Sequence, residues 1–204
     1  MKDQVYTPAQ ASAVADLPLK TVHKLMDNQV IRPQRRRVEG AIQRFLSFEQ
    51  LVYLGLEARG LSVLPLEIRR TVARSVEQSP NIDILSISEG SVLVIECKSV
   101  RKEVNDQVRR LKKAEEMTVS DPEILGGAPV YRGTRIPVAQ IAVMLDEGVT
   151  VDEILEGYPA LSREKIELAP LHLHAFPRRG RPARSPWARQ KPARATRRLQ
   201  TRAR

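Results

Sequence analysis

Residues 6–47 read YTPAQASAVADLPLKTVHKLMDNQVIRPQRRRVEGAIQRFLS, and this stretch decides the expected fold. Thr7-Pro8-Ala9-Gln10 is a capping box with proline at the first helical position, so we expect a helix to begin there. After a short turn, Pro18 opens a second helix whose apolar residues recur at helical spacing. The opposite face of that helix is polar and is expected to point outward. Its members are Lys20, Thr21, His23, Lys24 and Asp27.

A basic hairpin and a third helix follow. Residues 30–45 contain an arginine run and then Gly40, which indicates a hairpin with a charged tip. Ser47–Gln50 is a second capping box and starts a helix that ends at Gly60. Helix, helix, hairpin and helix is the order of a winged helix-turn-helix. Residues 1–60 are therefore predicted to bind DNA, although a small helical domain with a solvated charged face would also fit the charges.

In this interpretation the second helix lies in the major groove, and the arginines of the hairpin reach phosphates or the minor groove. The residues expected to contact DNA are Lys20, Thr21, His23, Lys24, Arg35, Arg36 and Arg37.

The same residues carry a family resemblance. Tyr6-Thr7-Pro8, residues 19–25 (LKTVHKL), Ile31-Arg32-Pro33 and residues 44–47 (RFLS) resemble the DNA-binding domain of MerR-type regulators. That resemblance implies that the second helix and the wing contact DNA. The effector-binding part usual in the family is not apparent, so the resemblance implies no bound metal or drug.

Residues 61–117 are predicted to form a helix, a β-hairpin and a connecting helix that together mediate dimerisation. The connecting helix is expected because Val104, Val108 and Leu111 recur at helical spacing. The hairpin is predicted around Glu89-Gly90, read as a two-residue loop. This loop would place Asp83 opposite Glu96, with Lys98 on the same face. These three residues match the Asp…Glu-x-Lys pattern of metal-dependent nucleases, in which two carboxylates hold Mg²⁺.

Two observations oppose a nuclease. Such enzymes need a larger sheet than two strands, and the sequence shows no third strand here. The same predicted face also carries apolar residues, which favours packing on a helix or a dimer partner. These residues are Leu85, Ile87, Val92 and Val94.

Residues 118–175 are predicted to form a unit of three short helices, with a capping box at Thr150–Glu153 and an end or kink of the third helix at Pro170. The string DPEILGGAPVYRGTRIPVAQIAVMLDEGVTVDEILEGYPALSREKIELA, residues 121–169, closely resembles a family of small prokaryotic helix-turn-helix domains named as a domain of unknown function. Such domains occur in antitoxins of VapBC-type systems. The resemblance implies a non-enzymatic antitoxin that restrains a PIN-domain ribonuclease toxin and represses its own operon. A DNA-binding regulator without a toxin is the alternative.

Residues 176–204 are predicted to be a disordered basic tail. The net charge of the chain is +10, but eleven Arg and Lys and no acidic residue follow Ala175, which leaves 23 basic and 24 acidic residues before the tail. The antitoxin resemblance implies that tail arginines pair with the metal-binding carboxylates of the toxin, since arginine binds carboxylates in bidentate fashion. A non-specific nucleic-acid tail is the alternative. The expected toxin-binding residues are Leu171, Leu173, Phe176, Arg178, Arg179, Arg181 and Trp187.

Composition narrows the remaining classes of protein and of site. The single cysteine, Cys97, excludes an internal disulfide, and His172 and His174 lack a third metal ligand nearby, so we expect no metal and no cofactor. The N-terminus lacks the apolar core of a signal peptide and no stretch has membrane-spanning length, which predicts a cytoplasmic protein without membrane contact. We therefore expect a mainly α fold with small β elements, acting as a homodimer.

Overall fold

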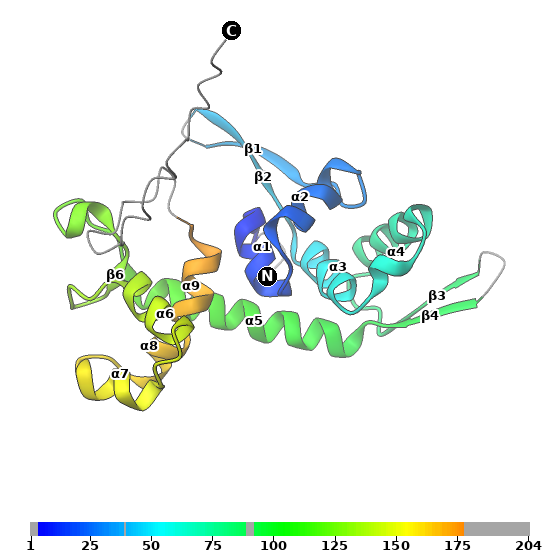
Figure 1. The fold of residues 1–204 in the computed structure, drawn as a ribbon. Coiled ribbons are helices and arrows are strands. Elements are labelled where there is room, and N and C mark those ends of the chain that lie inside the picture. Colours follow the sequence, from blue (N-terminus) through cyan, green and yellow to red (C-terminus); the bar gives the residue numbers. More distant parts are fainter. Residues whose placement is uncertain (1–3, 39, 89–91, 178–204) are drawn as a thin grey trace, which may run out of the picture.

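The computed structural model describes residues 4–38, 40–88 and 92–177, and the fold is mainly α with small β elements, as predicted (Figure 1). The helices are α1 (Pro8–Ala15), α2 (Leu19–Asp27), α3 (Phe48–Ala58), α4 (Leu66–Gln78), α5 (Lys98–Glu116), α6 (Val138–Asp146), α7 (Val151–Gly157), α8 (Arg163–Glu167) and α9 (Ala169–Ala175). The strands form antiparallel pairs, β1 (Gln34–Val38) with β2 (Ala41–Phe45), β3 (Ile84–Ser88) with β4 (Val92–Glu96), and β5 (Thr118–Val119) with β6 (Val130–Tyr131).

The helix starts follow the capping residues read from the sequence. In front of α1, the Gln10 backbone amide donates to Thr7 Oγ1 at 3.2 Å and the Thr7 amide donates to Gln10 Oε1 at 2.8 Å. The same reciprocal pair forms in front of α3 and α7, at Ser47 and Thr150. Each box satisfies backbone donors that a helix start leaves without a partner.

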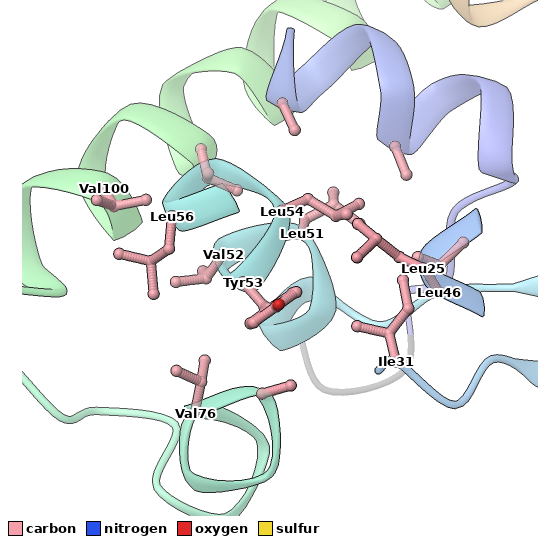
Figure 2. Packing of buried hydrophobic residues seen from close by; sticks show 14 of the residues in the cluster. Leu25, Ile31, Leu46, Leu51, Val52, Tyr53, Leu54, Leu56, Val76 and Val100 are labelled. Atoms are coloured by element: carbon pink, nitrogen blue, oxygen red, sulfur yellow. The ribbon is translucent and has the colours of Figure 1, made fainter. Parts of the chain in front are cut away.

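The first core has α3 at its centre. Leu51 and Leu54 face α1 and α2, Val52 and Tyr53 face α4, and Leu56 faces Val100 of α5 (Figure 2). A single buried cluster therefore unites the expected DNA-binding part, residues 1–60, with the central part, residues 61–117.

A buried ion pair closes the α3–α4 contact. Glu57 is 4% exposed and accepts hydrogen bonds from Arg69 and, at 2.8 Å, from Tyr53 Oη. Burial and the neighbouring Glu57 carboxylate raise the pKa of Tyr53. Because the carboxylate has two donors, its removal from water is compensated.

The second core belongs to the C-terminal helices α6–α9. Its buried residues include Tyr131, Ile141, Ile154 and Ile166. The helix preceding Pro170 ends at Glu167, and α9 begins at Ala169 with the proline in its first turn, where the missing N–H has no intrahelical partner to lose.

Helix α9 joins the two cores. Ala169 is buried in the second cluster and Ala175 in the first. The helix packs against α6 on one side and against α1 and α5 on the other (Figure 1). The C-terminal unit is thereby attached directly to α1, which precedes the basic hairpin, and to α5.

The central hairpin differs from the predicted register. Ser88 pairs with Val92 rather than with Ser91, so three residues, 89–91, lie between the paired strand ends. This one-residue shift turns every side chain of β4 to the other face. The result buries Ile95 beside Leu85, its pairing partner, and leaves Val94 61% exposed on the outer face.

The shift removes the predicted nuclease arrangement. By strand alternation Asp83 and Glu96 belong to opposite faces of the hairpin. Lys98 pairs with Asp83 at 3.6 Å, while Glu96 is held by the backbone amide and hydroxyl of Ser99, hydrogen bonds that lower its pKa. The expected common face of two carboxylates and a lysine is therefore wrong.

None of the described helices, including the 19-residue α5, combines the length and apolar character needed to cross a membrane.

Candidate nucleic-acid interface

Helix α2 presents two lysines to solvent. Its inner face is fixed by Val22, Leu25 and Met26, each no more than 5% exposed. Lys20 and Lys24 lie one turn apart on the opposite face and are exposed. Neither lysine joins an ion pair within the described ranges. Both charges are thus available to an anionic partner.

The other polar residues of α2 are differently placed. Thr21 and His23 are partly buried. Arg44 of β2 donates to His23 Nδ1 at 2.8 Å and forms an ion pair with Asp27 at 2.7 Å. His23 therefore contacts the hairpin, and Arg44 neutralises the acidic residue that would otherwise stand beside the two lysines.

The β1–β2 hairpin separates the three consecutive arginines. Arg35 pairs with Arg44 across the strands, so alternation places Arg35, Arg37 and Arg44 on one face. Because Arg44 contacts α2, this face lies on the same side as α2. Arg36 belongs to the opposite face, where its guanidinium lies 5.9 Å from the centre of the Phe45 ring. Of the three arginines predicted to contact DNA, only Arg35 and Arg37 lie on the same side as Lys20 and Lys24.

Sequence reading missed a second group of cations. Arg32, Arg70 and Arg74 line a polar cavity of about 510 Å³ between the end of α2 and helix α4. Arg70 donates to the backbone oxygen of Asn28 at 2.8 Å and pairs with Glu67 at 2.6 Å. The four-residue spacing of Arg70 and Arg74 was visible in the sequence, but their position beside α2 depends on the packing of α4.

A groove of about 870 Å³ runs between α2, the hairpin and the C-terminal unit. It is lined by His23 and Arg44 on one side and by Phe176 and Pro177 on the other. Pro177 is the last residue that the structure describes, and it lies at this groove.

The residues predicted to bind a toxin fall into two groups. Leu171 and Phe176 are partly buried against the first core, and the Phe176 ring lies 4.8 Å from that of His172, whereas Leu173 is 38% exposed. The hydrophobic contacts of Leu171 and Phe176 are therefore made within this chain. The remaining four residues lie outside the described part of the chain, and they are Arg178, Arg179, Arg181 and Trp187.

His172 contributes to structure at the base of α9. It is 5% exposed, and its Nε2 lies 3.0 Å from Thr118 Oγ1. Burial lowers its pKa. Within the described residues no cluster of three His, Cys, Asp or Glu side chains could hold a metal ion.

Comparison with known proteins finds a family that matches part of the chain and proteins that match most of it. A family described as a protein of unknown function, DUF433, matches residues 119–170. The crystal structure of Rv2018 from Mycobacterium tuberculosis is 18% identical and covers 83% of this chain and 100% of that one, with a TM-score of 0.35. The uncharacterized protein y4eO of Sinorhizobium fredii is 30% identical over 181 residues, covering 85% of this chain and 82% of that protein. This chain belongs to the same family as y4eO.

Proposed function

We propose that this protein binds operator DNA through α2 and the β1–β2 hairpin and serves as an antitoxin that represses its own operon. The observation that supports DNA binding best is the common orientation of two sets of cations. Lys20 and Lys24 are exposed and outside the ion pairs of the described chain, and Arg35 and Arg37 share the hairpin face that Arg44 joins to α2. A helix beside a basic hairpin suits the major groove and its flanking phosphates.

The experiment replaces the two lysines and follows binding to the DNA upstream of the gene at several salt concentrations. Lys20→Ala with Lys24→Ala should weaken binding and reduce the slope of log K against log salt by about one unit for each phosphate that the variant no longer neutralises. Arg109→Ala with Lys112→Ala is the matched control, because it removes equal charge from exposed positions on α5. Equal effects of the two pairs would reject α2 as the DNA-contacting helix.

The proposal includes a homodimer, since two α2 helices could then enter successive major grooves of a palindromic operator. The outer face of the β3–β4 hairpin supports this assignment. Ile84 and Val94 are 58% and 61% exposed there, and an isolated two-stranded hairpin is marginally stable in water. We place the dimer contact on this face.

The toxin-binding part of the proposal rests on the resemblance of residues 121–169 to antitoxin domains. A PIN-domain ribonuclease gathers carboxylates around its metal, and arginines can pair with them in bidentate fashion. Since Leu171 and Phe176 are engaged within this chain, we assign toxin contact to the exposed Leu173 and to the basic segment that begins at Arg178.

Co-expression with the product of the neighbouring gene tests this assignment. The informative shorter variant ends at Pro177, because it keeps α9 and hence the contact between the two cores. Co-purification and growth rescue by the full chain, but not by the shorter variant, would support a toxin-neutralising tail. If the neighbouring product binds neither version while operator binding persists, the protein is a DNA-binding regulator without a toxin.

A further inference from the structure

A cavity of about 830 Å³ lies between the start of α3, the first half of α5 and the turn after α4. Its volume is within the range of small-molecule sites, about 300–1,000 Å³. Tyr6, Phe48 and Val108 supply apolar wall, and Asn105 and Ser47 add polar groups. A small molecule with an apolar body fits these walls, and the charges decide which polar group it carries.

The charged side of the cavity is predominantly cationic. Lys98, Arg101 and Lys102 occupy neighbouring positions on one face of α5 and all line the cavity. Glu49 is the one carboxylate among the lining residues that the structure describes, and it accepts a hydrogen bond from Arg101 Nη1 at 2.8 Å. Asp83, outside the cavity lining, pairs with Lys98 at 3.6 Å. After these two pairings a positive excess remains in the cavity.

Arg101 retains unused hydrogen-bonding capacity. Its Nε and Nη2 atoms are buried and have no hydrogen-bond partner within residues 4–38, 40–88 and 92–177. Buried donors without a partner are rare in folded proteins. These two nitrogens form one edge of the guanidinium plane, the edge that binds the two oxygens of a carboxylate or phosphate in bidentate fashion. The Glu49 contact uses the other terminal nitrogen, so this edge has no partner among the described residues.

We propose that this cavity binds a small organic anion, whose carboxylate or phosphate pairs with Arg101 while its apolar body packs on Tyr6 and Phe48. Lys98 and Lys102 at the rim attract the same charge. The site is independent of the DNA-binding proposal, because its evidence lies in α5 and α3 and its test uses no DNA.

The test is calorimetric titration of the full-length protein with benzoate, phenyl phosphate and benzamide. Benzamide is the neutral control, since it keeps the ring and removes the charge. A fragment of this size reaches about millimolar affinity. At least one of the two anions should bind in this range, and benzamide should bind much more weakly. The anion that binds best identifies which oxyanion the cavity prefers.

Variants locate the binding. Arg101→Gln should weaken anion binding about tenfold or more, because it removes a charged bidentate partner. Arg109→Gln removes an exposed arginine from the same helix and should leave affinity unchanged. Lys102→Glu reverses a charge at an exposed lining position and should also weaken binding, which provides a second test if Arg101→Gln does not fold.

Three results would overturn the proposal. The first is the absence of saturable binding of both anions up to about ten times the expected millimolar constant. The second is equal affinity for benzamide and the anions. The third is retention of full anion affinity by folded Arg101→Gln and Lys102→Glu proteins.

Discussion

Replacement of Gly55 by alanine tests the contact between α3 and α5. A Cβ atom added at Gly55 would lie 2.8 Å from Val100 Cγ1 and 3.1 Å from Val104 Cγ2. Carbon atoms pack best at about 3.5–4.0 Å, so both contacts would be compressed. Val100 and Val104 are 2% and 3% exposed, and β-branched side chains in helices have one strongly preferred rotamer. Relief therefore requires α5 to move.

Two opposing effects set the magnitude. Overpacking a buried site costs about 1–3 kcal/mol. Alanine in place of glycine inside a helix stabilises by about 0.5–1 kcal/mol. We expect Gly55→Ala to lower the free energy of unfolding by about 0.5–2 kcal/mol, because the steric term is larger. Gly157→Ala in α7 is the control, since among the described residues nothing beyond its chain neighbours and its own helix backbone lies within 4 Å of the added Cβ, and it should be neutral to slightly stabilising.

Urea unfolding followed by circular dichroism measures both variants. Val100→Ala removes one of the two compressed atoms, so the Gly55→Ala, Val100→Ala double variant should lose less stability than the two single variants added together. A coupling of at least about 0.5 kcal/mol is expected for residues in contact. The reasoning is refuted if Gly55→Ala stabilises the protein as Gly157→Ala does, or if the two effects at positions 55 and 100 simply add.

Three further predictions concern stability and assembly. Arg69→Met should cost about 3–5 kcal/mol in urea unfolding, because it leaves the buried Glu57 carboxylate without its cationic partner, and adding Glu57→Gln should restore part of the loss. Burial lowers the pKa of His172, so the unfolded chain binds this proton more readily, and the stability that neutral His172 contributes is lost as pH falls below about 6.5. Substitution His172→Gln should make the unfolding free energy less dependent on pH between about 7.5 and 5.5, and an unchanged pH dependence would exclude this histidine as its source. Val94→Lys should convert the proposed dimer to a monomer, as measured by light scattering. Val63→Lys changes an 84% exposed position away from the hairpin and should leave the dimer intact. Equal masses for the wild type and both variants would place the dimer contact away from the hairpin.

Local features of the fold could be read from the sequence because their causes are local. The capping boxes at Thr7, Ser47 and Thr150 bond residues three apart, and the structure contains all three. The interruption at Pro170 follows from the missing amide of proline and is also present. The helical spacing of Val104, Val108 and Leu111 likewise predicted a helix here, and all three are buried in α5.

The errors arose where a contact depends on distant residues. The length of the central turn, three residues instead of two, could not be read from Glu89-Gly90, because the burial of Leu93 and Ile95 decides which strand face is turned inward. Arg44 lies in the predicted hairpin, as strand β2, but its contacts with His23 and Asp27 depend on how the hairpin packs over α2. The sequence shows which charged residues are present, but it does not show which of them pair with one another.

The position of α9 connects the two activities in the proposed function. This seven-residue helix packs on α1 through the first core and on α6 through the second, so it cannot be displaced without exposing apolar surface in both. Phe176 and Pro177, which follow it, line the groove beside His23 and Arg44. A toxin that engages the chain from Leu173 onward would therefore act at the edge of the proposed DNA-binding surface. Under this proposal, toxin binding and operator binding are coupled through α9, and the coupling must be reciprocal: a toxin that changes operator affinity by some factor has its own affinity changed by the operator by the same factor.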